Sequence, residues 1–326
     1  MKVLVTGASG FIGAALCEEL ARAGHSVRGF DRVPPPADLA CSIEAQLGDV
    51  TEPADCRRAV AGCQALCHLA ARVGDWGPAS EYLRVNVGGT RTLLEAARTA
   101  GLRRFVLVSS LAVHHYGGHL DADESAPRDG RINAYCRSKI AAEELVREEA
   151  GPLEWVIARP GVFPFGPRDR TSFLPLCRAL ERGRLGTVNQ GQALLCTAYV
   201  ENLAQGLRLA TCHPAAADQA FVFADPHATS WRELLALLAE ALGVAPPRLN
   251  LPELLAYPAA GAMELAWRLA RRREAPPLTR YRILLAARDC SFSSARAAER
   301  LGYDPRIGLE EGLRRAVAWY RTQPAD

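Results

Sequence analysis

A tyrosine and a lysine four residues apart are the side chains of this sequence best suited to moving a proton. Tyr135 and Lys139 stand in the stretch Tyr-Cys-Arg-Ser-Lys, and on a helix this spacing places both on one face. A free tyrosine has a pKa near ~10, which is too high for a base at neutral pH. An ammonium about 4 Å away contributes roughly 4 kcal/mol at an effective dielectric of about 20. We therefore expect Lys139 to lower the pKa of Tyr135 toward working pH.

A serine and the scarcity of lysine support this pair. Ser110 closes the apolar run Phe-Val-Leu-Val that precedes two serines, where its hydroxyl could bind a substrate oxygen. Among 39 basic residues only Lys2 and Lys139 are lysine, and arginine cannot supply the same compact ammonium charge. The predicted step is proton transfer between Tyr135 and a carbinol or carbonyl oxygen.

The first thirteen residues predict a dinucleotide site. Residues 2–6 form an apolar run that predicts a buried strand, and residues 14–23 predict a helix that ends at Gly24. A glycine turn between a strand and a helix presents backbone N–H groups to a pyrophosphate; a tight turn without a ligand is the alternative. The residues expected to contact the cofactor here are Gly7, Ser9, Gly10, Phe11, Ile12 and Gly13.

Two acidic residues follow at the ends of the next predicted strands. Asp31 ends the strand 26–30, about twenty positions past the glycines, where a carboxylate suits ribose hydroxyls and repels a 2′-phosphate. This favours NAD, although the adjacent Arg32 could accept that phosphate and leaves NADP open. Asp49, followed by Val50, could accept from an adenine amino group. The alternative for Asp49 is an N-terminal cap of the helix predicted after Pro53.

The alternation of predicted elements indicates the fold. Strands at 45–47, 65–69, 104–110 and 155–158 alternate with helices at 53–61, 78–99 and 134–150, and such order calls for a parallel sheet covered on both faces. We expect an α/β protein: a Rossmann-like doubly wound parallel sheet over residues 1–170 and a smaller, mostly helical C-terminal substrate lobe over residues 171–326. Segments of about 197–228 should return to the main sheet.

Composition excludes several kinds of protein. The chain has 326 residues, 49% hydrophobic and 23% charged, and a formal net charge of +3, so nucleic acid is not an expected partner. No run of eighteen apolar residues is free of charge, and the ten cysteines are expected to be reduced in a cytoplasmic protein. His114, His115 and His119 are predicted to be loop residues near the substrate entrance, and no metal site is expected.

Six motifs together resemble the extended short-chain dehydrogenase/reductase superfamily: Thr6-Gly7-x-x-Gly10-x-x-Gly13, His68-Leu-Ala-Ala71, Asn86-x-x-Gly-Thr90, Ser109-Ser110, Tyr135-x-x-x-Lys139 and Arg159-Pro160. By that resemblance Ser110, Tyr135 and Lys139 carry catalysis beside an NAD cofactor, and Lys139 also holds the nicotinamide ribose. Asn86 would support the helix that carries Tyr135. The resemblance places these further residues at the cofactor: Asp49, Val50, Leu69, Ala70, Ala71, Asn86, Pro160 and Val162.

Departures from the superfamily pattern narrow the range of activities expected of this chain. Leu111 and Ala112 stand where nucleotide-sugar dehydratases carry an Asp-Glu pair. Leu195 stands where nucleotide-sugar epimerases carry an arginine that grips the diphosphate, with Arg178 or Arg184 as substitutes. The segments 73–77, 199–202, 276–280 and 292–313 instead resemble the branch of 3β-hydroxysteroid dehydrogenases, sterol-4-carboxylate 3-dehydrogenases and 2-alkyl-3-oxoalkanoate reductases.

This branch implies an apolar substrate, sterol-like or long-chain, with a 3-hydroxy or 3-oxo group. Oxidation of a 4-carboxysterol would be followed by decarboxylation. A nucleotide-sugar 4-epimerase and a non-catalytic NAD(P)-sensing protein are the alternatives. Residues 251–273 join an apolar body to Arg271-Arg-Arg273, which suits peripheral contact with a membrane or an ordinary helix with a solvated basic end. Helices 78–99 and 134–150 are expected to form a homodimer face, as is usual in the superfamily.

Overall fold

A seven-stranded parallel sheet forms the centre of the computed structural model, which describes residues 1–114 and 118–324. Its strands follow the order β11 (Gln219–Phe223), β7 (Glu154–Pro160), β5 (Arg104–Val108), β4 (Ala65–His68), β1 (Lys2–Thr6), β2 (Ser26–Asp31), β3 (Glu44–Leu47). The chain starts inside the sheet, at β1; β2 and β3 are added on one side of β1, and β4, β5 and β7 on the other. Strand β11, from the C-terminal half, returns to the far edge beside β7.

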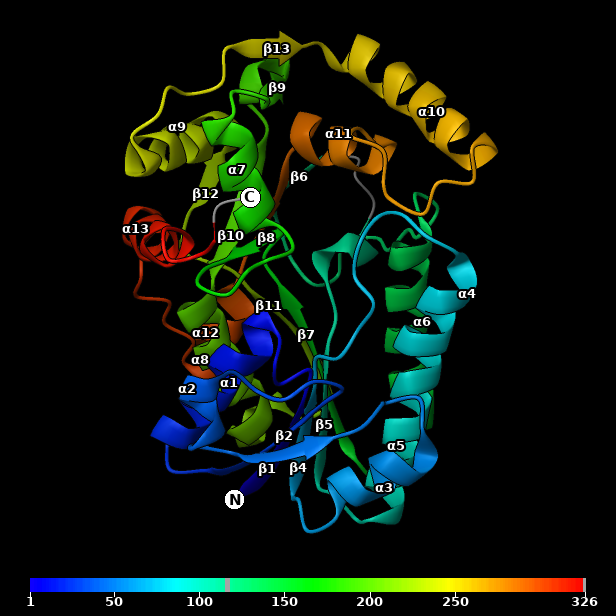
Figure 1. Cartoon of the computed structure of the whole chain (residues 1–326). Helices are drawn as coiled ribbons and strands as arrows, with labels where there is room; N and C mark the ends of the chain where they lie inside the picture. The colour runs from blue at the N-terminus through cyan, green and yellow to red at the C-terminus, as the bar shows by residue number, and fades with distance from the viewer. Residues whose placement is uncertain (115–117, 325–326) are drawn as a thin grey trace.

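Helices cover both faces of this sheet because its strands are apolar on both sides. Val3 and Val5 of β1 face a core formed with α1 (Phe11–Arg22) and α8 (Val200–Cys212). Leu4, between them, faces the opposite core, which includes residues of α3 (Pro53–Val60), α5 (Gly89–Thr99) and α6 (Ala134–Glu149). Figure 1 shows the two helical layers on either side of the strands.

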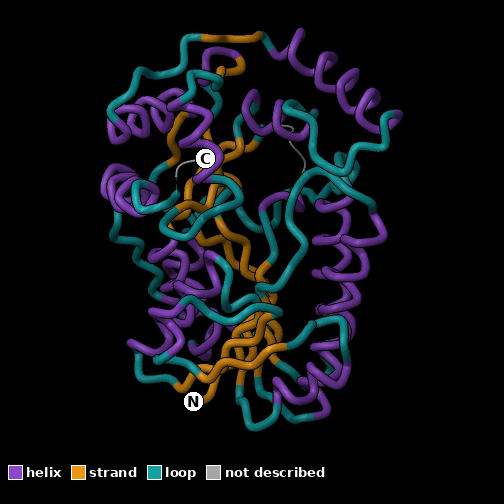
Figure 2. The backbone as a smooth tube through the Cα atoms, in the orientation of Figure 1, coloured by secondary structure: helices purple, strands orange, loops and turns teal. Residues whose placement is uncertain are grey.

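Much of the second half of the chain, together with β6 from the first half, builds a second region around two small sheets (Figure 2). One sheet joins β12 (Ala228–Ser230), β10 (Leu194–Tyr199), β14 (Cys290–Phe292), β6 (His119–Ala122) and β8 (Phe163–Phe165). The other pairs β13 (Leu249–Leu251) with β9 (Gly186–Val188). The helices of this region are α7 (Phe173–Glu181), α9 (Trp231–Leu242), α10 (Glu253–Leu269), α11 (Arg280–Ala287) and α13 (Leu309–Tyr320).

A buried carboxylate fixes the junction between the two regions. Asp225, just after β11, accepts hydrogen bonds from the backbone N–H of Tyr199 (2.9 Å), the Thr197 hydroxyl (2.7 Å) and Asn202 Nδ2 (2.8 Å). Asn202 Nδ2 also donates to the backbone oxygen of Ile307. The end of β10, the start of α8 and the C-terminal segment therefore meet at one side chain.

The predicted fold class is confirmed, with more strand in the C-terminal region than the sequence indicated. Strands of three residues, such as β8 and β9, and the helices α11 and α12 (Ala295–Leu301) were not predicted. The helix predicted over 78–99 consists of α4 (Ala79–Tyr82), a π-helical turn (Leu83–Gly88) and α5. The remaining short helix, α2 (Ala37–Ala40), follows β2.

Candidate active site

The glycine turn joins β1 to α1 so tightly that side chains do not fit. Gly7 has φ +70°, and a Cβ on it would lie 2.9 Å from the backbone nitrogen of Ala70; a Cβ on Gly13 would lie 2.0 Å from the carbonyl oxygen of Gly7. No side chain caps α1 at Gly10. The first N–H groups of α1 therefore keep their capacity to bind an anion. This cradle fits the pyrophosphate of a dinucleotide.

Asp31 lies beside that turn at the end of β2. Its carboxylate accepts from the backbone N–H of Ser9 at 3.0 Å and from that of Arg32 at 2.7 Å. The Ser9 hydroxyl donates to the backbone oxygen of Val33 at 2.8 Å. These bonds hold a carboxylate where the ribose of a bound dinucleotide would meet it, while the Arg32 side chain is exposed.

The ends of β3 and β4 complete this edge of the sheet. Leu69 and Ala70 donate their backbone N–H groups to the Thr6 hydroxyl, at 3.2 and 3.1 Å, which places this backbone against the glycine turn. Asp49 accepts from both the backbone N–H and the hydroxyl of Thr51. Its carboxylate thus closes a turn ahead of α3 and does not cap the helix, whose N-cap is Glu52.

Tyr135, Lys139 and Ser110 meet at the end of β5. Asn133 caps α6 by accepting from the backbone N–H of Cys136 at 2.8 Å, so Tyr135 lies in the first turn and Lys139 one turn later. The Lys139 ammonium donates to the backbone oxygen of Val108 at 2.9 Å. The side chains of Tyr135 and Ser110 are hydrogen-bonded. The three predicted catalytic side chains therefore share one location.

The expected lowering of the tyrosine pKa by Lys139 is wrong for this arrangement. Burial raises the pKa of Tyr135 to about 12, although the hydrogen bond with Ser110 opposes the rise. Burial also lowers the pKa of Lys139 to about 8, against the opposing charge of Glu143. Both shifts have one cause, because a group withdrawn from water disfavours its charged form. The ammonium donates to Val108 instead of to the phenol, so Tyr135 keeps its proton.

A chain of hydrogen bonds links β1, the strand before the glycine turn, through β4 to α5 and the π-helical turn. Thr90 donates its hydroxyl to the backbone oxygen of Asn86 at 2.6 Å. It must therefore accept from His68 Nε2, 3.1 Å away, which leaves His68 Nδ1 to accept from the Thr6 hydroxyl at 2.7 Å. Burial, reinforced by the Lys139 charge, lowers the pKa of His68 to about 3. His68 is neutral, with its proton on Nε2.

Asn86 continues this chain to α6, as predicted for a supporting residue. Its Nδ2 donates to the Ser138 hydroxyl at 2.8 Å, and Ser138 donates to the backbone oxygen of Tyr135 at 2.8 Å. The rest of the amide exchanges two hydrogen bonds with the backbone of Arg72. The side chain is buried in the π-helical turn, so its visible role is to position α6 and the loop after β4.

Behind the catalytic residues lies a buried ion pair that the sequence did not reveal. Arg159, at the end of β7, donates to the two carboxylate oxygens of Glu143 at 2.9 and 2.7 Å, and both side chains are fully buried. Arg159 also lies 3.2 Å from His114 Nε2. The signal was present: Glu143 follows Lys139 by four residues and therefore shares its face of α6.

His114, His115 and His119 were predicted to be loop residues near the substrate entrance; this is wrong for His119, which lies in β6, whereas His114 lies outside the named strands and helices and His115 lies outside the described residues. Both described rings are buried and stack near Phe292, at 4.8 and 4.9 Å between centroids. Burial, reinforced by the Arg159 charge, lowers the pKa of His114 to about 4. These histidines belong to the packing between β6 and β14. Residues 1–114 and 118–324 contain no cluster of three metal-ligating side chains.

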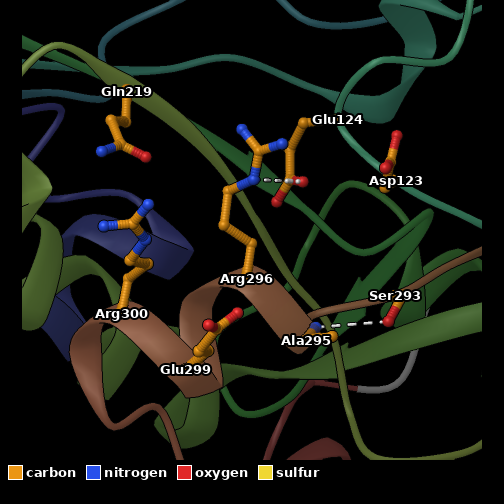
Figure 3. Close-up of a pocket in the computed structure, with 8 residues that line it drawn as sticks. All are labelled: Asp123, Glu124, Gln219, Ser293, Ala295, Arg296, Glu299 and Arg300. Carbon is orange, nitrogen blue, oxygen red and sulfur yellow. Dashed lines mark hydrogen bonds and ion pairs between the residues drawn. The ribbon is translucent and has the colours of Figure 1, made fainter.

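A polar cavity of about 430 Å³ lies along the outer edge of β11 (Figure 3). Figure 3 shows Arg296 extending toward Glu124, and their Nε and Oε2 atoms are 3.2 Å apart. The other Glu124 oxygen accepts from the backbone N–H of Val222 at 2.8 Å and so covers the open strand edge. The lining of the cavity is mostly charged and contains none of the predicted catalytic residues, so the cavity does not suit an apolar substrate.

Comparison with known proteins agrees with this geometry. The model of the NAD dependent epimerase/dehydratase family matches residues 3–224. The 2-alkyl-3-oxoalkanoate reductase of Stenotrophomonas maltophilia is 34% identical, over 98% of this chain and 99% of that protein. A 3 beta-hydroxysteroid dehydrogenase/Delta 5-->4-isomerase of Mycobacterium tuberculosis is 33% identical, over 98% and 90%. The structure of MoeE5 in complex with UDP-glucuronic acid and NAD has 28% identity and a TM-score of 0.78, over 98% and 99%.

Proposed function

Because the chain belongs to the NAD dependent epimerase/dehydratase family, we propose that it interconverts a ketone and a secondary alcohol on an apolar, lipid-like substrate. The family match covers residues 3–224, which include every predicted catalytic residue. The chain is thus an oxidoreductase of the extended short-chain type. Its proposed substrate is a 3-oxo or 3-hydroxy compound, long-chain or sterol-like, as the names of the reductase and the steroid dehydrogenase suggest for those relatives.

One observation carries this proposal: the catalytic hydroxyls adjoin an apolar cluster. Leu111, the residue after Ser110, belongs to a buried apolar cluster with residues of β10, β11, α11 and β14, including Leu284 and Phe292. Val162, Tyr257 and Tyr281 are partly buried and pack against this cluster. Leu195 is fully buried in the core, so no guanidinium stands at that position to bind a diphosphate. A hydrocarbon substrate would gain by covering the partly exposed residues at the border of this cluster, such as Val162, Tyr257 and Tyr281.

The protonation states favour reduction as the direction of the chemistry. A protonated Tyr135 can donate its proton to the carbonyl oxygen of a bound ketone while the Ser110 hydroxyl hydrogen-bonds the same oxygen. A bound dihydronicotinamide would supply the hydride that the carbonyl carbon needs. The C=O double bond would become a C–O single bond, with a new C–H bond from the hydride and a new O–H bond from the Tyr135 proton. Lys139 donates to Val108 in the resting site, but its positive charge, one helical turn from Tyr135, would still attract the transient phenolate, which regains a proton from solvent.

We assign NAD as the cofactor on the basis of Asp31. Its carboxylate is fixed beside the glycine turn by Ser9 and Arg32 backbone N–H groups, where it can accept from ribose hydroxyls and repels a 2′-phosphate. NADH should therefore support turnover at lower concentration than NADPH. An Asp31→Asn variant should narrow that difference by raising the KM for NADH. Equal KM values for the two cofactors in the unaltered protein would contradict the assignment.

The function is tested by incubating the protein with NADH and a 2-alkyl-3-oxo acid and following the near-ultraviolet absorbance of the reduced nicotinamide. We expect the absorbance to fall, and Tyr135→Phe to reduce the rate by about a hundredfold or more. Tyr320→Phe, on α13, is the matched control and should keep full activity. Unchanged turnover in Tyr135→Phe would refute the assigned proton donor.

The reverse assay addresses sterols. A 3β-hydroxysterol and NAD⁺ should produce NADH, and a 4-carboxysterol should release CO₂ after oxidation, because a β-keto acid loses its carboxylate readily. Oxidation of the carboxysterol without CO₂ would remove decarboxylation from the proposal. It would leave the oxidoreductase assignment in place.

A nucleotide-sugar 4-epimerase is the second candidate function. The likeness to MoeE5, whose structure holds UDP-glucuronic acid and NAD, favours it. The buried Leu195 disfavours it, and one suggested substitute, Arg178, donates to the backbone oxygen of Pro324. Conversion of UDP-glucose to UDP-galactose would establish this alternative. NAD binding without turnover of either substrate class would instead indicate an NAD(P)-sensing protein, which the assembled Tyr135 and Lys139 disfavour.

We also propose a homodimer through α5 and α6. Both helices lie on the face of the main sheet opposite to α1 and α8, at the border of the molecule (Figure 1). A second copy could pack against them there. Light scattering of the purified protein should give twice the mass of one chain. A single-chain mass at micromolar concentration would refute the dimer.

A further inference from the structure

Helix α10 turns its apolar side toward solvent. Its leucines are among the most exposed of the chain: Leu254 is 83% exposed, Leu255 63%, Leu265 59% and Leu269 76%. Positions 254, 258, 262, 265 and 269 follow one another three or four residues apart, and Leu255 lies next to the first of them, so the four leucines lie along one side of the helix. The residues between them on that side are Pro258, Ala259, Ala262 and Ala266, all exposed. The exposed side is a continuous apolar stripe.

The charge in the middle of α10 points inward instead. Glu264 is only 7% exposed and accepts from the backbone N–H of Arg280 at 2.7 Å, with the Arg280 guanidinium 2.9 Å away. Ala256 and Ala260 share this buried side. A surface helix normally shows the opposite order, with charge outside and apolar residues inside. The helix is attached to the protein by this ion pair and by the packing of Ala256 and Ala260, and it leaves its leucines uncovered.

The groups around the stripe are mainly cationic. Arg271, Arg272 and Arg273 follow α10 directly and are exposed, as are Arg268 within it and Arg248 before it. Glu253 is bound to Arg288 at 3.0 Å. Glu274 is the remaining exposed carboxylate of residues 248–274, all of which the structure describes. An apolar stripe with an arginine-rich rim complements a hydrocarbon layer covered by anionic headgroups.

We propose that α10, together with Arg271–Arg273, docks the protein on the surface of an anionic lipid bilayer. The helix would lie in the plane of the interface with its leucines among the acyl chains and the arginines at the phosphates. Within residues 1–114 and 118–324, no helix is long and apolar enough to cross a membrane, which suits a lateral contact. A second copy of the chain would instead bring an equally cationic rim, and the like charges would repel.

The docked helix would lie next to the substrate side of the site. Tyr257, on α10, belongs to the apolar cluster that includes Leu111, the neighbour of Ser110. Figure 1 shows α10 at the outer border of the C-terminal region, at the opposite end of the molecule from the N-terminus. Helix α10 packs on α11. Bilayer contact would therefore bring lipid to the cluster that we assign to the substrate, and this consequence rests on the proposed function.

The far end of α10 also contacts the loop after β4. Trp76 Nε1 donates to the backbone oxygen of Arg272 at 3.2 Å, and the Arg268 guanidinium lies over the Trp76 ring at 5.6 Å. The backbone oxygen of Trp76 accepts from the Tyr82 hydroxyl at 2.8 Å, and the centroid of the Tyr82 ring lies 6.3 Å from that of the Tyr135 ring. One continuous set of contacts thus joins the docking helix to the proton donor.

The test is sedimentation of the full-length protein with vesicles. We expect it to pellet with vesicles of phosphatidylglycerol and phosphatidylcholine in equal parts, and to stay in solution with phosphatidylcholine alone. Arg271→Gln, Arg272→Gln and Arg273→Gln combined should weaken binding by about fivefold for each arginine removed. A matched triple of exposed arginines far from α10, Arg22→Gln, Arg57→Gln and Arg300→Gln, should bind nearly as well as the unaltered protein.

A pair of leucine variants distinguishes the loss of apolar contact at the stripe from a general effect of a more polar surface on vesicle binding. Leu265→Gln should weaken vesicle binding by about fivefold or more, whereas Leu47→Gln, 56% exposed on β3, should not. Failure to bind anionic vesicles, or equal binding of the two arginine triples, would overturn the proposal. A lower mass for Leu265→Gln than for the unaltered protein, measured by light scattering without lipid, would also overturn it, because the stripe would then be the contact with a second copy of the chain.

Binding is measured without turnover, so a failure of the proposed function leaves this test intact. Tyr135→Phe should bind vesicles as the unaltered protein does. Loss of vesicle binding in Leu265→Gln with full activity on a short, soluble 3-oxo acid would support docking separately from catalysis.

Discussion

Neutralising Glu143 tests whether the buried ion pair behind the site is structural. The Glu143 carboxylate has no exposed side-chain surface and binds Arg159, whose side chain is 1% exposed. Glu143→Gln keeps the shape of the side chain but leaves a buried guanidinium without its counter-charge. Breaking a buried pair in this way costs about 3–5 kcal/mol.

The expected effect on thermal unfolding follows from chain length. At about 2.1 cal/mol/K per residue, 326 residues give an unfolding entropy of about 0.7 kcal/mol/K. A loss of about 3–5 kcal/mol then lowers Tm by about 4–7 °C, which scanning calorimetry resolves. Glu144→Gln is the matched control, because Glu144 is half-exposed and reaches Arg128 at 3.7 Å. It should cost at most about 1 kcal/mol.

The acid dependence gives a second readout. Burial raises the pKa of Glu143, but the hydrogen bond and charge of Arg159, together with the Ser109 hydrogen bond and the Arg147 charge, hold that pKa below its usual value. Its stabilisation is therefore complete above the unfolded-state pKa of about 4.3 and is lost as pH falls through the lower folded-state pKa. The Tm difference between the unaltered protein and Glu143→Gln should be constant near neutrality and shrink in acid.

Two results would refute this reasoning. Equal Tm values for Glu143→Gln and Glu144→Gln would show that Arg159 is satisfied without the carboxylate. A Tm difference that grows in acid would show that the sign of the pKa shift is wrong. If Glu143→Gln alone does not fold, Glu143→Gln combined with Arg159→Met should, because replacing both partners removes the uncompensated charge.

Three further perturbations bear on the site. Gly13→Ala should abolish NAD binding in calorimetric titration, because its Cβ would lie 2.0 Å from the oxygen of Gly7; normal affinity would contradict the geometry of the turn. Thr90→Val should lower kcat with little change in KM, because it removes the acceptor of His68 and the bond to Asn86, whereas a KM effect alone would point to substrate contact. The reduction rate should fall as pH rises through about 8, where the buried Lys139 loses its charge; a flat profile to pH 10 would refute that pKa.

The site was predictable to the extent that single residues carry its chemistry. The glycine spacing and the pair Tyr135 and Lys139 identified the strand ends that meet, because parallel strands bring their carboxyl ends to one edge. The electrostatics were not predictable, since the pKa of Tyr135 depends on how deeply the fold buries its phenol and on where the Lys139 ammonium points. Glu143 was missed because a glutamate on a helix is ordinarily exposed, and only the fold brings Arg159 to it.

The fold was predictable for long, strongly patterned elements and not for short ones. β1 and β5 each contain a short run of branched apolar or aromatic residues bounded by turn residues, a pattern typical of a buried strand. Three-residue strands such as β8 exist through pairing with β10, which lies over thirty residues away in the chain, and carry no periodicity of their own. The inward-facing Glu264 of α10 likewise follows from its partner Arg280, which local sequence cannot indicate.

The hydrogen bonds from Thr6 through His68 and Thr90 to Asn86 all have their donors in the same order. Turning one hydroxyl would set two lone pairs against each other, so these protons can leave only when the strands and the helix separate locally. The His68 Nε2 proton should then exchange with deuterium as slowly as core amides do. A single resonance in a proton spectrum would report how often the cofactor-facing strand ends part from the helix that supports Tyr135.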